Sequence, residues 1–130
     1  MGNVLVLDDE LDILNLVRII LSQKKYNVLA TSRIDEFYSL LKEDVNLILL
    51  DVVMPEKTGI EICVELKKDP KTSKIPIILF SASGSAEKRD AAIQAGADAF
   101  LLKPFSIIQL MDTVNKYYPL STYSKIERKR

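Results

Sequence analysis

The chain has 130 residues with 18 basic and 18 acidic side chains, so it has the size of one ordinary domain and no net charge. This balance argues against direct nucleic-acid binding, and no apolar run approaches the ~18 residues that cross a membrane. The absence of histidine excludes Ser-His and Cys-His catalytic pairs and histidine metal sites, while the single cysteine, Cys63, excludes an internal disulfide and favours a cytoplasmic setting.

Two kinds of segment alternate along the chain. Short, nearly continuous apolar runs are typical of strands that are buried on both faces of a parallel sheet. We predict strands at Val4–Leu7, Val28–Thr31, Leu47–Leu50, Ile75–Phe80 and Ala99–Leu102. Longer amphipathic segments predict a first helix around Ile13 to Ile20 and further helices near Ile34–Lys42, Gly59–Lys68, Ala86–Ala95 and Ser106–Tyr118.

The pattern within and after the helices refines these expectations. The helical template predicts that the first helix turns one stripe toward the core, formed by Ile13, Leu16, Val17 and Ile20, which leaves Leu11, Leu14 and Ile19 outside that stripe. Asp69-Pro70 is expected to end the third helix, and Gly96 stands where a helix C-terminal glycine belongs.

Five strands that alternate with five helices predict a single doubly wound α/β domain with helices on both faces of the sheet. We expect this domain to span residues 1–119. The remaining residues, 120–130, contain the basic sequence S-K-I-E-R-K-R and are expected to be a C-terminal tail or linker.

Polar residues follow several of the predicted strands. Asp8-Asp9-Glu10 follow the first strand, Asp51 the third, Ser81 the fourth and Lys103-Pro104 the fifth. Because ligands of open parallel sheets bind at the carboxyl ends of the strands, we expect these groups to converge at one edge.

Each of these residues also has a simpler explanation when it is considered alone. Asp9 is suited to cap a helix, Asp51 to form a turn before Met54-Pro55, Ser81 to cap a loop, and Lys103 to be an exposed lysine. Carboxylates held close together repel one another unless a positive charge lies among them. Mg²⁺, which prefers oxygen ligands, would satisfy them, and a lysine with a hydroxyl would complete a pocket for a tetrahedral dianion.

The motifs D-D-E at 8–10, L-L-D-V-V-M-P at 49–55 with Gly59, S-A at 81–82 and K-P-F at 103–105 occur in this order over residues 3–118. Together they resemble the receiver domain of two-component response regulators. The resemblance implies a flavodoxin-like (βα)5 three-layer sandwich whose five-stranded parallel sheet has the strand order 2-1-3-4-5.

The resemblance also implies a role for each site residue. Asp51 would be the phosphoacceptor, and Mg²⁺ would be held by Asp8, Asp9, Asp51 and the backbone carbonyl of Val53. Lys103 would pair with a phosphoryl oxygen. Ser81 and Phe100 would be the switch residues, with Phe100 at a position where many relatives carry tyrosine.

Further residues are implied to shape or tune the site. Pro55 and Gly59 would shape the loop after Asp51, and Pro104 would follow Lys103 through a cis peptide bond. Glu10 is expected just outside the metal ligands. Val53 and Ser83 occupy positions that tune phosphoryl lifetime, and because neither carries an acid or an amide, we expect slow hydrolysis.

The implied partner is a sensor histidine kinase or a histidine phosphotransfer protein, docked at the start of the first helix near Leu11 and Leu14. The output is implied to be a downstream protein or a fused effector domain, so the chain itself is expected not to be an enzyme. Two alternatives stay open. A Mg²⁺-dependent aspartyl phosphatase lacks its second acid, because Val53 stands in that place, and a pseudo-receiver would act as an interaction module without phosphorylation.

Overall fold

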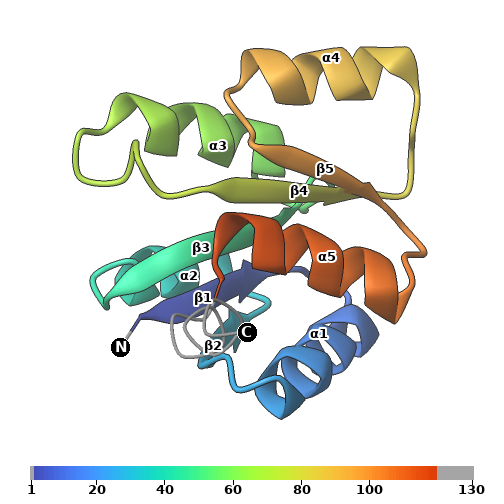
Figure 1. Cartoon of the computed structure of the whole chain (residues 1–130). Helices are drawn as coiled ribbons and strands as arrows, with labels where there is room; N and C mark the ends of the chain where they lie inside the picture. The colour runs from blue at the N-terminus through green and yellow to red at the C-terminus, as the bar shows by residue number, and fades with distance from the viewer. Residues whose placement is uncertain (1, 120–130) are drawn as a thin grey trace.

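The apolar segments form one five-stranded parallel sheet in the order β2-β1-β3-β4-β5 (Figure 1). The computed structural model describes residues 2–119, so the predicted tail, residues 120–130, lies outside the described residues. The strands are β1 (Asn3–Leu7), β2 (Val28–Thr31), β3 (Val45–Asp51), β4 (Ile77–Ser81) and β5 (Ala99–Leu102). The helices are α1 (Leu11–Gln23), α2 (Ile34–Leu40), α3 (Gly59–Lys68), α4 (Ala86–Gln94) and α5 (Ile107–Tyr117). The predicted doubly wound fold and strand order are confirmed.

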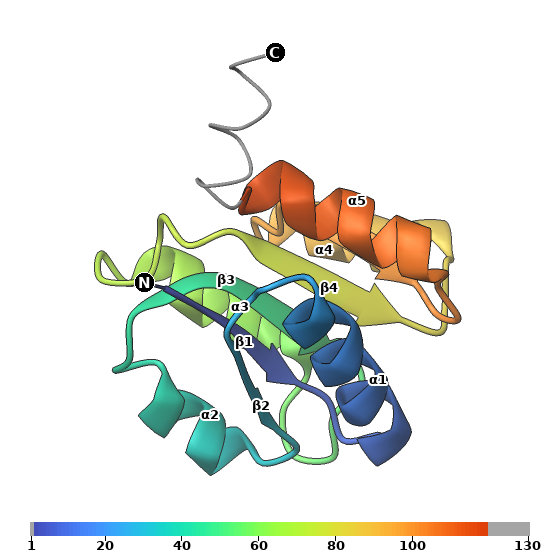
Figure 2. The ribbon, with the colours of Figure 1, turned by 60° about the horizontal axis from the view of Figure 1, so that its bottom comes forward.

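The helices cover both faces of the sheet, and the sheet separates the core into two clusters (Figures 1 and 2). Side chains of α2, α3 and α4, including Phe37, Ile62 and Ala92, pack on one face. Side chains of α1 and α5, including Val17 and Leu110, pack on the other. The strands β1 and β4 are buried at every position, and β3 at all but one, as expected for strands covered on both faces.

Several predicted boundaries shift by one or two residues. Strand β3 extends to Asp51, so this acid is the last residue of the strand and does not follow it. Strand β4 begins at Ile77, two residues later than predicted, because Pro76 has no N–H to donate; its carbonyl still accepts a hydrogen bond from the N–H of Ile48 at 3.0 Å. Helix α2 ends at Leu40, earlier than the predicted Lys42.

The predicted core face of α1 is partly wrong. The prediction puts Leu14 outside the core stripe and Leu16 inside it, but Leu14 is buried and Leu16 is 43% exposed. The buried positions of the helix are Leu14, Val17, Ile20 and Leu21. The helix is apolar on more than one face, so its sequence supports two similar stripes, and packing against the sheet selects one of them.

The helix ends agree with the local sequence. Thr58 and Ser106 begin α3 and α5 as capping boxes with Glu61 and Gln109. Asp69 ends α3 before Pro70, and Gly96 follows α4 with a φ of +91°, a conformation that favours glycine. Both predicted helix ends are therefore confirmed.

Helix α4 is the shallowest of the helices. Ala92 is its one buried residue, and Ile93 on the same helix is largely exposed. Within residues 2–119, no helix is both long and apolar enough to cross a bilayer.

Candidate functional site

The carboxyl ends of β1 and β3 bring three carboxylates together. The two strands pair in parallel with Leu7 opposite Leu50, so the residues after them, Asp8 and Asp51, emerge at the same level of the sheet. One carboxylate oxygen from each of Asp8, Asp9 and Asp51 lies within 4.8 Å of the other two. Asp8 and Asp51 are buried, whereas Asp9 is exposed. The predicted convergence at this edge is therefore seen in the structure.

Lys103 supplies the positive charge at this edge. It follows β5, and its N–H donates to the carbonyl of Ser81 at 2.8 Å, which fixes the backbone beside β4. Its Nζ lies 2.9 Å from Asp8 Oδ2 and 3.3 Å from Asp51 Oδ1. The peptide bond to Pro104 is cis, as predicted.

One lysine does not balance the negative charge of this cluster. Burial and the neighbouring Asp8 carboxylate raise the pKa of Asp51 from 3.8 to about 7, although Lys103 opposes the shift. Burial of Lys103 disfavours its charged form, but the hydrogen bond to Glu10 and the nearby Asp8 and Asp51 carboxylates raise the pKa of Lys103 above its ordinary value. The cluster therefore favours additional positive charge.

The donor set fits a hard divalent cation. Asp8 Oδ2 is fully buried and has no hydrogen-bond partner, because Lys103 approaches it at 2.9 Å without hydrogen-bond geometry. Buried carboxylate oxygens without a partner are costly, and carboxylates are the ligands that Mg²⁺ takes in proteins. Asp8, Asp9 and Asp51 thus have the chemistry and the spacing of a Mg²⁺ site.

The loop after Asp51 is shaped by Gly59. A Cβ on this residue would lie 2.2 Å from the Asp51 carbonyl oxygen, so no other residue fits without moving the strand end. The Gly59 N–H donates to the carbonyl of Val52 at 2.9 Å, which closes the loop. Val53 and Pro55 are both exposed on this loop, and Met54 between them is buried.

Ser81 and Phe100 occupy neighbouring strands. Ser81 is buried at the end of β4, and its hydroxyl accepts a hydrogen bond from the N–H of Ser83 at 3.0 Å. Phe100 is half-buried against the core on the side of α3 and α4, with the Arg89 guanidinium 5.1 Å from the centre of its ring. Only Ser81 of these two lies at the strand end that carries the acids.

The sequence did not predict the contact that Glu10 makes. Lys103 Nζ donates to Glu10 Oε1 at 2.8 Å, across a sequence separation of 93 residues. Glu10 is the residue before α1, and its N–H donates to Asp8 Oδ1 at 2.9 Å. The third acid of the D-D-E motif was the available signal, but its partner depends on side-chain geometry that the sequence does not reveal.

A groove in the described part of the chain lies away from these acids. It has a volume of about 580 Å³ and lies beside the connections α2–β3 and α3–β4, lined by Tyr38, Leu41, Glu65 and Thr72 among others. These connections lead into the amino ends of β3 and β4, so the groove is at the opposite edge of the sheet from the acids. The chemistry of the acid edge identifies the candidate site.

Comparison with known families agrees with this geometry. The family described as "Response regulator receiver domain" matches residues 4–115. The chain belongs to the response regulator receiver domain family. It is a receiver domain of the two-component type, as the resemblance of its motifs implied.

Relatives of this receiver domain include proteins named as transcriptional regulators. The transcriptional regulatory protein CpxR of Klebsiella pneumoniae is 33% identical over 125 residues, which cover 96% of this chain and 53% of that protein. The phosphate regulon transcriptional regulatory protein PhoB of Rhizobium meliloti is 36% identical over 110 residues, which cover 84% and 48% respectively. The chain thus spans about half the length of these relatives.

Solved structures share the fold. The chemotaxis response regulator CheY4 of Vibrio cholerae matches with a TM-score of 0.83 at 28% identity, over 90% of this chain and 98% of that one. A CheY-like receiver domain protein of Methanospirillum hungatei matches with a TM-score of 0.82 at 24% identity, over 100% and 99%.

Proposed function

We propose that this receiver domain accepts a phosphoryl group on Asp51 and thereby switches its output surface. The observation that carries the proposal is the placement of Asp51 at the edge of the sheet, with two further acids within 4.8 Å and the Lys103 ammonium 3.3 Å away. Asp51 is nearly buried there, so its surroundings and not bulk water set its reactivity.

The transfer step uses the carboxylate of Asp51 as the nucleophile. One of its oxygens attacks the phosphorus of a phosphohistidine, a P–O bond forms, the P–N bond breaks, and the histidine nitrogen keeps the electron pair. None of these 130 residues is a histidine, so the phosphohistidine lies outside this sequence, and a histidine kinase or a histidine phosphotransfer protein would supply it. Lys103 then lies where it can pair with a phosphoryl oxygen.

Asp8, Asp9, Asp51 and the backbone carbonyl of Val53 would hold Mg²⁺. When it is bound, Mg²⁺ supplies positive charge that offsets the charge on the carboxylates and on the transferred group. Ionisation of Asp51, which its raised pKa of about 7 otherwise opposes, is favoured by the same positive charge.

Ser81 and Phe100 would transmit the phosphorylated state to the surface. The Ser81 hydroxyl holds the N–H of Ser83 at 3.0 Å, so a hydroxyl that turns toward a phosphoryl oxygen releases the β4–α4 loop. Phe100 packs on the face that α4 covers and would follow this change by moving inward. Phenylalanine has no hydroxyl, so any output that needs an outward tyrosine hydroxyl is absent.

The output partner is a fused effector domain or a separate protein in the cytoplasm. Relatives of about twice this length are named as transcriptional regulators, which supports an effector domain in a longer regulator. Direct nucleic-acid binding by the receiver domain itself is not part of the proposal, because its acidic and basic residues balance.

The phosphorylated state is expected to be long-lived. Val53 and Ser83 provide no carboxylate or amide to orient a water molecule for attack on the phosphoryl group. A self-dephosphorylation half-life of only seconds, measured after removal of the phosphodonor, would contradict this part of the proposal.

Intact-protein mass spectrometry after incubation with acetyl phosphate and Mg²⁺ tests the function. We expect one added phosphoryl group on the wild type and on Asp98→Asn, a control far from the site, and none on Asp51→Asn. Absence of the adduct on the wild type would instead favour a phosphorylation-independent interaction module.

A further inference from the structure

Glu10 holds a distinctive position among the acids around Lys103. Lys103 Nζ donates a hydrogen bond to Glu10 Oε1 at 2.8 Å. The contacts with Asp8 and Asp51, at 2.9 Å and 3.3 Å, are ion pairs by distance. Asp8 and Asp51 belong to the carboxylate cluster that could hold a cation, whereas Glu10 does not.

Burial separates Glu10 from the other two acids. The side chains of Asp8 and Asp51 are 0% and 5% exposed, whereas that of Glu10 is 60% exposed. Asp8 is also fixed, because its other oxygen accepts from the N–H of Glu10 at 2.9 Å. If Lys103 has to give up a partner, Glu10 is the one that returns to water at the lowest cost.

A lysine ammonium has three protons to donate, and three carboxylates already surround this one. A phosphoryl oxygen that arrives on Asp51 adds a fourth negatively charged group to the contacts of the ammonium. We propose that Glu10 is a positioning residue that holds the Lys103 ammonium before transfer, and that Lys103 exchanges Glu10 for a phosphoryl oxygen when Asp51 is phosphorylated; this inference rests on the proposed function.

The exchange has two consequences. Glu10 keeps Lys103 at the mouth of the acid cluster, so the ammonium is in place before the phosphoryl group arrives. It also competes with that group, because the contact with Glu10 must break. An ion pair with an exposed partner is weak, so the competition amounts to roughly a two- to five-fold effect on affinity.

Two variants separate contact from charge. Glu10→Gln removes the charge and weakens the acceptor, whereas Glu10→Asp keeps the charge on a side chain one methylene too short for the 2.8 Å contact. Asp12→Asn is the matched control, since it removes an exposed acid two residues away on the first turn of α1. All three changes are at exposed positions, so the variants are expected to fold.

The first measurement is the rate at which the Lys103 ammonium protons exchange with water. It is detected by NMR on the metal-free protein with ¹⁵N-labelled lysine. Both Glu10 variants should exchange faster than the wild type, and Asp12→Asn should match the wild type. An unchanged rate of proton exchange in both Glu10 variants would overturn the proposal, whether or not Asp51 can be phosphorylated.

The second measurement is the affinity for beryllofluoride, a phosphoryl mimic, titrated in saturating Mg²⁺. Both Glu10 variants should bind it roughly two- to five-fold more tightly than the wild type. If Glu10→Gln alone binds beryllofluoride more tightly, the charge of Glu10 and not its contact with Lys103 sets the affinity. If all variants bind it equally, Glu10 does not compete with the phosphoryl group. Either result rejects the exchange. A wild type that binds no beryllofluoride contradicts the proposed function, while ammonium exchange still decides whether Glu10 holds Lys103.

Discussion

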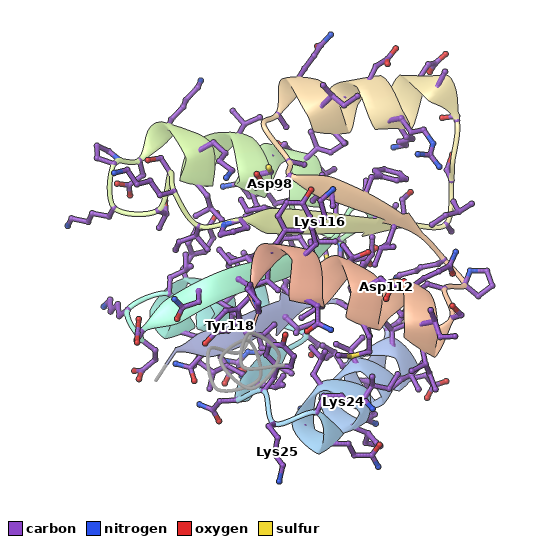
Figure 3. The ribbon with its side chains drawn as sticks, in the orientation of Figure 1. Lys24, Lys25, Asp98, Asp112, Lys116 and Tyr118 are labelled. Carbon is purple, nitrogen blue, oxygen red and sulfur yellow. The ribbon has the colours of Figure 1, made fainter. Side chains whose placement is uncertain are left out.

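Two lysines sit at opposite ends of the sheet and have opposite surroundings. At the amino end, Lys67 Nζ donates to the carbonyls of Ser73 and Ile75 at 3.3 Å and 2.9 Å and to Asp98 at 3.1 Å. Asp98 lies just before β5 (Figure 3), and the oxygen that Lys67 contacts also accepts from the N–H of Ile77 at 2.8 Å. One positive charge meets one negative charge, and each of these groups is hydrogen-bonded.

At the carboxyl end, Lys103 faces Asp8, Glu10 and Asp51, and one buried oxygen of Asp8 has no hydrogen bond. Here the fold holds together charges that repel one another. The comparison teaches that a buried lysine alone does not mark a functional site. An excess of like charge around the lysine is the stronger indication, because such an arrangement costs stability and is common at functional sites.

The largest expected effect comes from Asp51→Asn in the metal-free protein. Because the folded-state pKa of Asp51 is about 7, above the ordinary 3.8, its contribution to stability is lost as pH rises through about 7. At pH of about 8, the variant should therefore be more stable than the wild type by roughly 3 kcal/mol, and the difference should shrink as pH falls toward about 5. Urea unfolding at several pH values in EDTA measures this.

Asp98→Asn gives the opposite sign at the other end. It replaces an acceptor of two hydrogen bonds, so we expect it to be less stable than the wild type by about 1 to 2 kcal/mol. If both asparagine variants change stability in the same direction at about pH 8, the contrast between the two ends is wrong.

Mg²⁺ should remove the charge excess at the carboxyl end. At a concentration roughly 100 times the dissociation constant, the metal should stabilise the wild type by about 2.7 kcal/mol. Because Asp51 has a pKa of about 7, binding near this pH should also release a fraction of a proton. Thermal unfolding and calorimetry in two buffers measure these effects. Asp9→Asn should lose most of the stabilisation and Asp12→Asn none.

Lys67→Met and Lys103→Met should separate stability from phosphorylation. Lys67→Met removes the hydrogen bonds that Lys67 donates to two carbonyls and to Asp98, so it should destabilise the protein by about 2 kcal/mol while phosphorylation on Asp51 continues. Lys103→Met should abolish phosphorylation. Urea unfolding and the acetyl phosphate assay decide this, and loss of phosphorylation in a folded Lys67→Met protein contradicts the assignment.

The smallest effect is expected for Lys57, a third lysine that lies on the surface. It pairs with Glu65 and lies 5.5 Å from the centre of the Tyr38 ring. Water screens such a pair, so Lys57→Met should change the midpoint of thermal unfolding less than Lys67→Met does. An equal or larger shift would show that pairing alone, and not burial, distinguishes these lysines.

The sequence predicted the sheet and the acid edge because both follow from local patterns. Apolar runs identify the strands, and parallel strands place their final residues at a common edge, so Asp8 and Asp51 could be brought together without coordinates. The positions of Gly59 and Gly96 were predictable for the same reason, since a tight approach and a positive φ both favour glycine.

Other features depend on packing and on side-chain conformation. The prediction buries Leu16 and exposes Leu14, the reverse of the structure, because α1 is apolar on several faces. Only packing against the sheet decides which of the two is buried. The contacts of Lys103 with Glu10 and of Lys67 with Asp98 join residues that are 93 and 31 positions apart. The sequence shows which residues are charged but not which of them form contacts in the fold.

The small buried surface of α4 has a consequence for local stability. A single buried alanine, Ala92, provides little apolar surface to hold a helix, so opening α4 exposes less than opening any helix anchored by leucine or phenylalanine. Its amide protons should therefore exchange with solvent sooner than those in the middle of α3 or α5. The helix next to the Ser81 loop is thus the least firmly held part of its layer, and it can shift without unpacking the core.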